Sequence, residues 1–187
     1  MTRYATIVAD PPWDMGKHGR YGGTVFAGQV KEALPYPTMT IEAIKALPVA
    51  TLAADDAHLY LWTVNRYLEE SYDIARAWGF RPAQLLTWAK TPMGKGNGGA
   101  FSQTTEHVIF ARRGTLPHLQ RHPSTWWNWP RTRKAGDCHS RKPEAFLDLV
   151  EQISPPPFLE MFARDRRLGW DSWGNEVNGV ALPLEAA

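Results

Sequence analysis

The sequence predicts an α/β fold with three layers, in which a largely parallel sheet lies between helices. Short apolar runs alternate along the chain with segments whose apolar residues have helical spacing. The first run, residues 5–9, is rich in β-branched residues and ends abruptly at a carboxylate and two prolines, as a buried strand would. No internal repeat or domain-sized linker interrupts the 187 residues, so we expect one domain over residues 1–187.

Five further strands and three helices follow from the same patterns. We expect strands at residues 58–64, 83–89, 106–111, 158–162 and 168–173. The first helix, residues 41–47, has Thr40 as its cap and Glu42 in its first turn. The second, residues 66–78, ends at Gly79, and the third, residues 142–153, has Pro143 in its first turn and Ser140 available as its cap.

The segment after the first strand is Asp10-Pro11-Pro12-Trp13. Neither proline can donate a ladder hydrogen bond, and each restricts the residue before it to extended geometry. The strand end therefore presents a carboxylate, carbonyls that no helix uses, and an aromatic ring. These groups suit a flat molecule with an exocyclic amino group, whose two hydrogens the Asp10 carboxylate and a proline carbonyl can accept. A proline-rich turn with a packed tryptophan is the structural alternative.

Composition points to an ordinary globular protein: 43% of the residues are hydrophobic, 21% are charged and the net charge is +2. No apolar run approaches the ~20 residues that a membrane span needs, and the N-terminus lacks a signal-peptide pattern. The single Cys138 excludes an internal disulfide. We therefore expect a cytoplasmic protein with no membrane contact. His118 and His122 are bracketed by prolines, so we expect no metal site.

Basic residues are concentrated between residues 107 and 143, where Asp137 is the only acid. They are Arg112, Arg113, Arg121, Arg131, Arg133, Lys134, Arg141 and Lys142. Such an excess indicates a face that binds a polyanion, although a solvated basic loop is the alternative. Trp126, Trp127 and Trp129 could stack on bases, or could fill the core or an oligomer interface. We expect loops on the substrate side at residues 14–33, 93–104 and 112–139.

Several motifs, taken in order, resemble the mRNA-type adenine-N6 methyltransferases and their bacterial and phage DNA-modifying relatives. Asp10-Pro11-Pro12-Trp13 is the most specific of them. The others are Leu34-Pro35-Tyr36-Pro37-Thr38-Met39, Leu59-Tyr60-Leu61-Trp62, Trp88-Ala89-Lys90-Thr91, Glu106-His107, Ser140-Arg141-Lys142-Pro143 and Gly174-Asn175-Glu176. The resemblance covers roughly residues 5–177. It implies a Rossmann-like methyltransferase fold in circularly permuted order, with the catalytic motif near the N-terminus and the cofactor strand near the C-terminus.

The resemblance also implies S-adenosylmethionine as the cofactor. Its contacts would be Asp10, Lys142, Glu160, Phe162, Arg164, Asn175 and Glu176. Lys142, at a helix N-terminus, also suits an anion such as a carboxylate, with ordinary surface charge as the alternative. Relatives often carry an Asp-containing motif upstream that holds the cofactor adenine. Only nine residues precede Asp10 here, so we expect that contact to be missing or to come from elsewhere.

The function that we expect is methyl transfer from S-adenosylmethionine to N6 of adenine, with DNA preferred over RNA because the chain is compact. Asp10, Pro11, Pro12 and Trp13 would be catalytic. Substrate contacts would come from Trp13 as a stacking surface, Tyr36, Arg131, Arg133 and Lys134. The same chemistry can act on N4 of cytosine or on a glutamine amide. A catalytically silent nucleic-acid-binding subunit is a further alternative, and a homodimer is possible.

Overall fold

The computed structural model describes residues 3–14, 37–90, 101–130, 141–175 and 177. Its sheet has seven strands in the order β5-β3-β4-β2-β1-β6-β7. The strands are β1 (Tyr4–Ala9), β2 (Ala53–Thr63), β3 (Arg81–Ala89), β4 (Thr105–Arg113), β5 (Trp126–Trp127), β6 (Phe158–Met161) and β7 (Trp170–Trp173). The first strand of the chain therefore lies between β2 and β6 near the middle of the sheet.

The sheet is largely parallel, as the sequence predicts. Strand β1 pairs in parallel with β2 and β6, β6 with β7, and β3 with β5. Strand β4 makes both antiparallel pairings, one with β2 and one with β3. Among the seven strands described, β4 alone runs opposite to the others. Strand β1 carries Asp10 at its end and pairs with β6 from near the C-terminus, which is the permuted order that we expected.

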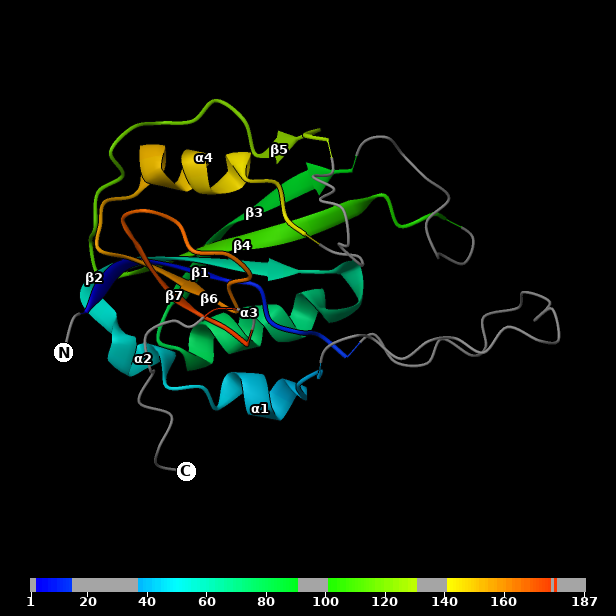
Figure 1. Cartoon of the computed structure of the whole chain (residues 1–187), viewed down its shortest axis with the longest axis horizontal. Coiled ribbons are helices and arrows are strands. Elements are labelled where there is room, and N and C mark those ends of the chain that lie inside the picture. The colour runs from blue at the N-terminus through cyan, green and yellow to red at the C-terminus, as the bar shows by residue number, and fades with distance from the viewer. Residues whose placement is uncertain (1–2, 15–36, 91–100, 131–140, 176, 178–187) are drawn as a thin grey trace, which may run out of the picture.

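Helices cover both faces of the sheet. The helix α4 (Ala145–Ile153) lies on one face, while α1 (Ile41–Lys45), α2 (Val49–Leu52) and α3 (Leu68–Ala77) lie on the other (Figure 1). A 3₁₀ turn, Asn65–Tyr67, joins β2 to α3. The three predicted layers are therefore present, and the domain is of the α/β class.

Alternation along the strands produces the two apolar layers. Ile7 of β1 and Leu59 of β2 belong to the core cluster on the α1–α3 side, together with Ile44 and Ile74 from the helices. The next residues along these strands, Val8 and Tyr60, belong to the cluster on the α4 side, which also contains Phe146 and Val150. Trp62, Trp78 and Trp88 are all buried.

Most predicted elements are present, with shifted boundaries. Thr40 caps α1 as predicted, because its Oγ1 accepts a hydrogen bond from the Ala43 amide at 3.1 Å. The helix α4 begins at Ala145 rather than at residue 142, and its N-cap Glu144 makes no capping side-chain bond. Pro143 therefore precedes the helix instead of lying in its first turn, and Ser140 falls outside the described residues. Within the predicted loop at 112–139, β4 continues to Arg113 and β5 adds a further short strand.

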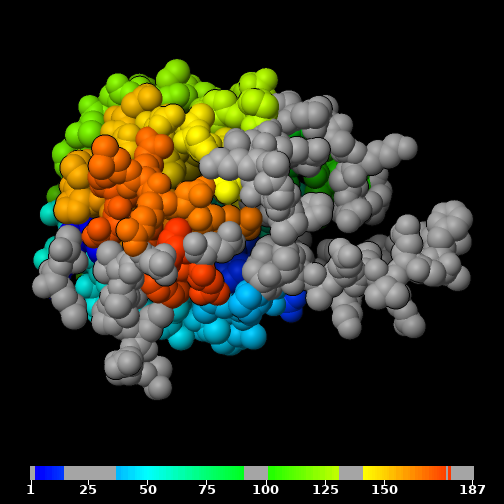
Figure 2. All heavy atoms as spheres, in the orientation of Figure 1, coloured from blue at the N-terminus to red at the C-terminus, as the bar shows by residue number. Residues whose placement is uncertain are grey.

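The arrangement brings distant segments to one edge of the sheet. Because β1, β2, β3 and β6 run the same way, their carboxyl ends lie at the same edge, which is where open α/β sheets bind ligands. In Figure 2 the blue segment after β1 reaches the surface between the orange and red C-terminal strands and the cyan segment of α1. No helix in the described ranges combines the length and apolar composition that crossing a bilayer requires.

Candidate active site

The end of β1 places Asp10 at the carboxyl edge of the sheet. Ala9 is the last strand residue, and the Asp10 amide donates to the Met161 carbonyl of β6 at 3.4 Å. Pro11 and Pro12 have no amide hydrogen, so the ladder cannot continue beyond them. The Asp10 side chain is thereby held where the parallel strands end, with 26% of its surface exposed.

The proline carbonyls are less available than the sequence suggested. The Pro11 carbonyl accepts a hydrogen bond from the Trp13 amide at 2.8 Å, and the Pro12 carbonyl accepts one from the Met39 amide at 3.0 Å. No helix uses these carbonyls, as we expected, but each accepts one backbone hydrogen bond from outside a helix. Each carbonyl oxygen has a second lone pair, so each can still accept one more hydrogen bond.

Trp13 is buried, with 6% of its surface exposed. Its indole Nε1 donates to the Trp62 carbonyl at 3.2 Å, and its ring stacks on Tyr67 with the ring centres 5.3 Å apart and an interplanar angle of 21°. One face of the indole is thus covered by Tyr67. The role of Trp13 as a stacking surface for a base stays a prediction.

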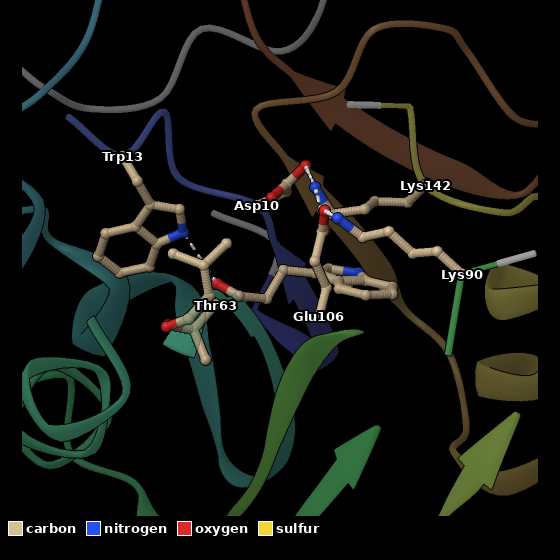
Figure 3. Close-up of polar contacts among 8 residues, drawn as sticks. Asp10, Trp13, Thr63, Lys90, Glu106 and Lys142 are labelled. Carbon is tan, nitrogen blue, oxygen red and sulfur yellow. Dashed lines mark hydrogen bonds and ion pairs between the residues drawn. The ribbon is translucent and has the colours of Figure 1, made fainter. Parts of the chain in front are cut away.

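Three charged side chains, those of Lys142, Glu106 and Lys90, meet beside Asp10, as Figure 3 shows. The Lys142 Nζ lies 2.7 Å from Asp10 Oδ2 and 3.3 Å from Glu106 Oε2. The Lys90 Nζ lies 2.5 Å from Glu106 Oε1. The exposed fractions of these side chains are 16% for Lys142, 16% for Lys90 and 8% for Glu106. We call these four residues the charge cluster; its two acids and two bases balance.

Strand pairing assembles the charge cluster. Trp88 of β3 is paired with Glu106 of β4, so Lys90 and Glu106 lie at the same end of this hairpin. Lys142 comes from the segment just before α4. The sequence assigned no role to Glu106 or Lys90. The signal that could have found them is a charged residue at the end of an otherwise apolar strand, since an ionised group is buried only with partners.

Burial and ion pairing act against each other in the charge cluster. Burial raises the pKa of the Asp10 carboxyl, although Lys142 opposes this. Burial alone would also raise the pKa of Glu106, but Lys142 and Lys90 together hold it below its ordinary value. Burial alone would lower the pKa of Lys142, yet the carboxylates of Asp10 and Glu106 raise it above its usual range. Asp10 is thus the acid of the cluster that takes up a proton more readily.

Two cavities meet at this cluster. The first, of about 190 Å³, is lined on one side by Pro11, Pro12 and Trp13. Its wall is completed by Pro37, Thr63, Val64, Lys90, Gln103, Thr105, Glu106, Ala163 and Asn175. The second, of about 270 Å³, lies toward α4 and contains Glu160. Asp10, Lys142, Phe162 and Arg164 line both, so the Asp10–Lys142 ion pair stands where the two cavities meet.

The predicted cofactor residues that the structure describes are brought together here. Lys142, Phe162 and Arg164 line both cavities, Glu160 lines the second, and Asn175 lines the first. Glu176 lies outside the described residues. Burial, with the nearby Asp10 and Asp165, raises the pKa of Glu160 to about 7. Within the described part of the chain, its carboxyl group has no hydrogen bond or ion pair.

The connection after β6 passes very close to the end of β7. Phe162 has a φ of 64°, a value that residues with a side chain rarely adopt. Ala163 donates from its amide to the Trp173 carbonyl at 2.9 Å. A Cβ on Gly174 would lie 2.3 Å from the Ala163 carbonyl oxygen, so only glycine allows this approach. Strain of this kind is often found at ligand sites.

Much of the predicted basic face is used inside the protein. Arg112 donates to the Leu116 carbonyl, Arg113 to the Ala50 carbonyl, and Arg141 pairs with Asp165. With Lys142 in the charge cluster, these four side chains all have partners within the protein, and the phosphate-binding role of the basic face stays a prediction. Arg131, Arg133, Lys134 and Tyr36, the other predicted substrate contacts, lie outside the described residues.

The tryptophans of this stretch divide between the two alternatives. Trp127 and Trp129 stack with ring centres 5.1 Å apart and pack against the core cluster on the α4 side. Trp126 is 59% exposed. Two of the three therefore extend the core. Within the described residues, no three His, Cys, Asp or Glu side chains are grouped as a metal site would require.

A largely parallel α/β sheet with a partly buried ion pair and two neighbouring cavities at its carboxyl edge defines a Rossmann-like fold with a candidate ligand site at that edge. Comparison of the sequence with known proteins identifies the family. Residues 4–176 match the MT-A70 family, so the chain belongs to this family and is a methyltransferase. Methyltransferases of this family generally use S-adenosylmethionine.

Relatives of this chain come from bacteria, plants and animals. It is 28% identical to the type II methyltransferase M.MunI of Mycoplasma sp over 98% of this chain and 82% of the relative. It is 30% identical to a probable N(6)-adenosine-methyltransferase of Oryza sativa subsp. japonica over 96% of this chain and 24% of the relative. It is 24% identical to the human N(6)-adenosine-methyltransferase catalytic subunit METTL3, again over 96% of this chain but 29% of the relative. The chain thus spans only about a quarter of the last two proteins.

Proposed function

We propose that this chain transfers a methyl group from S-adenosylmethionine to the N6 amino group of adenine in DNA. The observation that carries the proposal is the Asp10–Lys142 ion pair of 2.7 Å at the junction of two cavities. A methyl transferase must bring an acceptor and a donor together at one point. A carboxylate held between two cavities can address both molecules.

The first cavity suits the acceptor base. Pro11, Pro12 and Trp13 form one wall, and Glu106 and Lys90 form another. Asp10 and the remaining lone pair of a proline carbonyl can accept the two hydrogens of an exocyclic amine. The apolar wall of the first cavity would exclude water from the face of the base that it covers, and this would strengthen the hydrogen bonds made there.

The second cavity suits the donor. The Glu160 carboxyl lies at this cavity with a raised pKa and no hydrogen bond within the described residues. A cationic or hydroxyl-bearing ligand would satisfy it, and S-adenosylmethionine has an ammonium, a sulfonium and ribose hydroxyls. Lys142 and Arg164 supply cations for its carboxylate. When bound, the cofactor supplies an electrophilic methyl group on its sulfonium.

The chain's own residues would act on the amine nitrogen. The lone pair of N6 is delocalised into the purine ring, so the amine is a weak nucleophile. Hydrogen bonds to Asp10 and a proline carbonyl direct the lone pair away from these acceptors and stabilise the positive charge that develops on the nitrogen. Fixing the amine in this position contributes the entropic part of the rate enhancement.

Asp10 is also suited to take the proton that the methylated nitrogen must lose. As the nitrogen gains a carbon it loses one hydrogen, and the pair of electrons from that N–H bond stays on nitrogen. Because burial raises the pKa of Asp10, its carboxylate is a better base than an exposed one. Lys142 cannot serve as this base, since its raised pKa keeps it protonated.

The choice of DNA rests on the similarity to the type II methyltransferase M.MunI, since type II methyltransferases modify DNA. This similarity covers 98% of the chain at 28% identity, while two N(6)-adenosine-methyltransferases are similar over 96% of the chain at 30% and 24% identity. RNA is the alternative, and the described residues include no group that would separate the two by their ribose. In duplex DNA, adenine would have to leave the stack to reach the first cavity.

Nucleoside analysis tests the proposal. The purified chain is incubated with methyl-labelled S-adenosylmethionine and DNA in one reaction, and with the same cofactor and RNA in another. The nucleic acid is then digested, and the nucleosides are identified by mass spectrometry. We expect label in N6-methyladenine from DNA. Label in cytosine or in protein would reject adenine as the acceptor, label only in RNA would reject DNA, and no label with bound cofactor would favour a silent binding subunit.

A further inference from the structure

We propose that Tyr67 is a positioning residue that holds the Asp10–Trp13 segment at the edge of the first cavity. Only the expected effect of Tyr67 on turnover rests on the proposed function. Tyr67 lies in the 3₁₀ turn that follows β2, more than fifty residues from Trp13 in sequence. Neither the sequence patterns nor the predicted site residues included it.

Two contacts connect Tyr67 to the segment. Its ring stacks on the indole of Trp13, with the centres 5.3 Å apart and the planes at 21°. Its hydroxyl donates a hydrogen bond to the carbonyl of Asp14, the residue after Trp13. One side chain thus holds both the ring and the backbone at the far end of the segment.

Tyr67 is itself firmly placed. Its amide donates to the Val64 carbonyl at 2.9 Å, and its carbonyl accepts from the hydroxyls of Ser71 at 2.6 Å and Thr63 at 3.3 Å. Thr63 and Ser71 are buried and bonded to each other at 2.6 Å. Thr63 and Val64 also line the first cavity. The turn therefore connects the cavity wall to the segment that carries Asp10.

The geometry needs such an anchor. The Asp10 amide still bonds to the Met161 carbonyl, but the two prolines after it have no ladder partner. From Pro11 onward, the described backbone bonds that hold the segment are those of the Trp13 amide to Pro11 and the Met39 amide to Pro12. If Trp13 could swing out, the proline carbonyls would move with it. A displacement of about 1 Å in a positioned group can cost roughly a hundredfold in rate.

The surroundings argue against a different role for Tyr67, as a contact for the phosphate backbone. Among the charges that act on its hydroxyl, Arg66 comes first and the acids Asp14 and Glu70 follow, and Glu69 also stands in the first turn of α3. Arg66 places its guanidinium 5.4 Å from the Tyr67 ring centre, but in this acidic setting. A polyanion would be repelled here, whereas a neutral anchor is unaffected.

The chain offers a matched control in Tyr72. It lies on α3, packs partly buried against the same core cluster, and has Arg76 over its ring at 5.8 Å. Within the described residues, it makes no ring contact or hydrogen bond with the Asp10–Trp13 segment. Tyr67→Ala and Tyr72→Ala therefore remove the same group from similar surroundings, and Tyr67→Phe removes only the bond to Asp14.

The test combines turnover with amide hydrogen exchange, measured by NMR on the full chain. For Tyr67→Ala we expect kcat to fall roughly tenfold to a hundredfold with little change in the KM for S-adenosylmethionine. The amides of Trp13 and Met39 should exchange roughly tenfold faster. Tyr67→Phe should show a smaller change of the same kind, and Tyr72→Ala neither effect.

The outcomes separate this inference from the proposed function. Unchanged exchange at Trp13 and Met39 in Tyr67→Ala would overturn the anchoring role, whatever the activity. Equal losses of kcat in Tyr67→Ala and Tyr72→Ala would show that Tyr67 matters only for general stability. If the unmodified chain transfers no methyl group, the proposed function fails, while the exchange rates still decide the role of Tyr67.

Discussion

Replacing Lys142 by methionine removes the cation that the partly buried Asp10 carboxylate and the buried Glu106 carboxylate share. The Nζ of Lys142 lies 2.7 Å from Asp10 and 3.3 Å from Glu106. At an effective dielectric constant of about 20, each pairing attracts by about 5–6 kcal/mol, and desolvation offsets much of this. Leaving buried charges without a partner typically costs about 3–5 kcal/mol, so we expect Lys142→Met to lose stability on that order.

A double variant makes this prediction sharper. Lys142→Met leaves two carboxylates and one ammonium in the charge cluster, an excess of one negative charge. Adding Asp10→Asn restores neutrality and keeps the pair of Glu106 with Lys90, at 2.5 Å. The double variant should therefore unfold at a higher denaturant concentration than Lys142→Met, although it lacks activity. Lys45→Met, at an exposed position in the last turn of α1, is the control and should change stability by less than about 0.5 kcal/mol.

Urea unfolding followed by circular dichroism measures these differences, with methyl transfer assayed in parallel. An unfolding free energy of Lys142→Met within about 0.5 kcal/mol of the unmodified chain would contradict the reasoning. So would a double variant no more stable than the single one, because the loss would then not arise from unbalanced charge.

Three further predictions concern single contacts. The pKa of Glu160 is raised from 4.5 to about 7, so between these pH values the folded protein keeps a proton that the unfolded chain releases. This proton contributes up to about 3 kcal/mol of stability, which is fully present below pH 4.5 and is lost as the pH rises through 7. Glu160→Gln should flatten that slope in unfolding measured from pH 4 to 8, and an unchanged slope would refute the assignment. Gly174→Ala would place a Cβ 2.3 Å from the Ala163 carbonyl oxygen, so thermal unfolding should show a loss of about 1–3 kcal/mol of stability and calorimetry a weaker cofactor affinity. Unchanged stability and affinity would contradict this prediction, because the backbone would then have moved to accept the Cβ without cost. Thr40→Ala removes the cap of α1 and should lower the unfolding free energy by about 1 kcal/mol without altering turnover. A change in kcat would contradict this prediction.

The parts of the fold that local chemistry decides could be predicted. The β-branched run before Asp10 became β1, and the prolines ended it where expected. Thr40 was recognised as a cap because its neighbours supply the helix that it begins. The apolar face of α4 was visible because Phe146, Leu149 and Val150 recur at helical spacing, and all three are buried. In each case the determining residues are close in sequence.

What could not be predicted depends on register and on distant neighbours. Glu106 meets Lys90 because β3 and β4 pair in one register, and a one-residue slip would point Glu106 to the other face. Lys142 also forms an ion pair with Asp10, 132 residues away, which no local pattern could indicate. Strand β5 has only two residues, too few for any periodicity to show.

The sequence left the burial of Trp13 as an alternative for a related reason. A tryptophan after two prolines can face solvent or the core, and local pattern does not separate these. Its position depends on the Trp62 carbonyl and the Tyr67 ring, both of which come from the end of β2 and the turn after it. Long-range contacts of this kind shape the site, while local patterns mark where it lies.

The most direct test of the account is the single-turnover rate of Asp10→Asn with DNA and S-adenosylmethionine, compared with the unmodified chain. Asparagine has the shape of aspartate but lacks its charge and cannot accept a proton, so we expect the rate of N6-methyladenine formation to fall by roughly a thousandfold or more while the protein remains folded. A rate within about threefold of the unmodified chain would show that Asp10 neither holds the amine nor receives its proton, and would contradict the central claim.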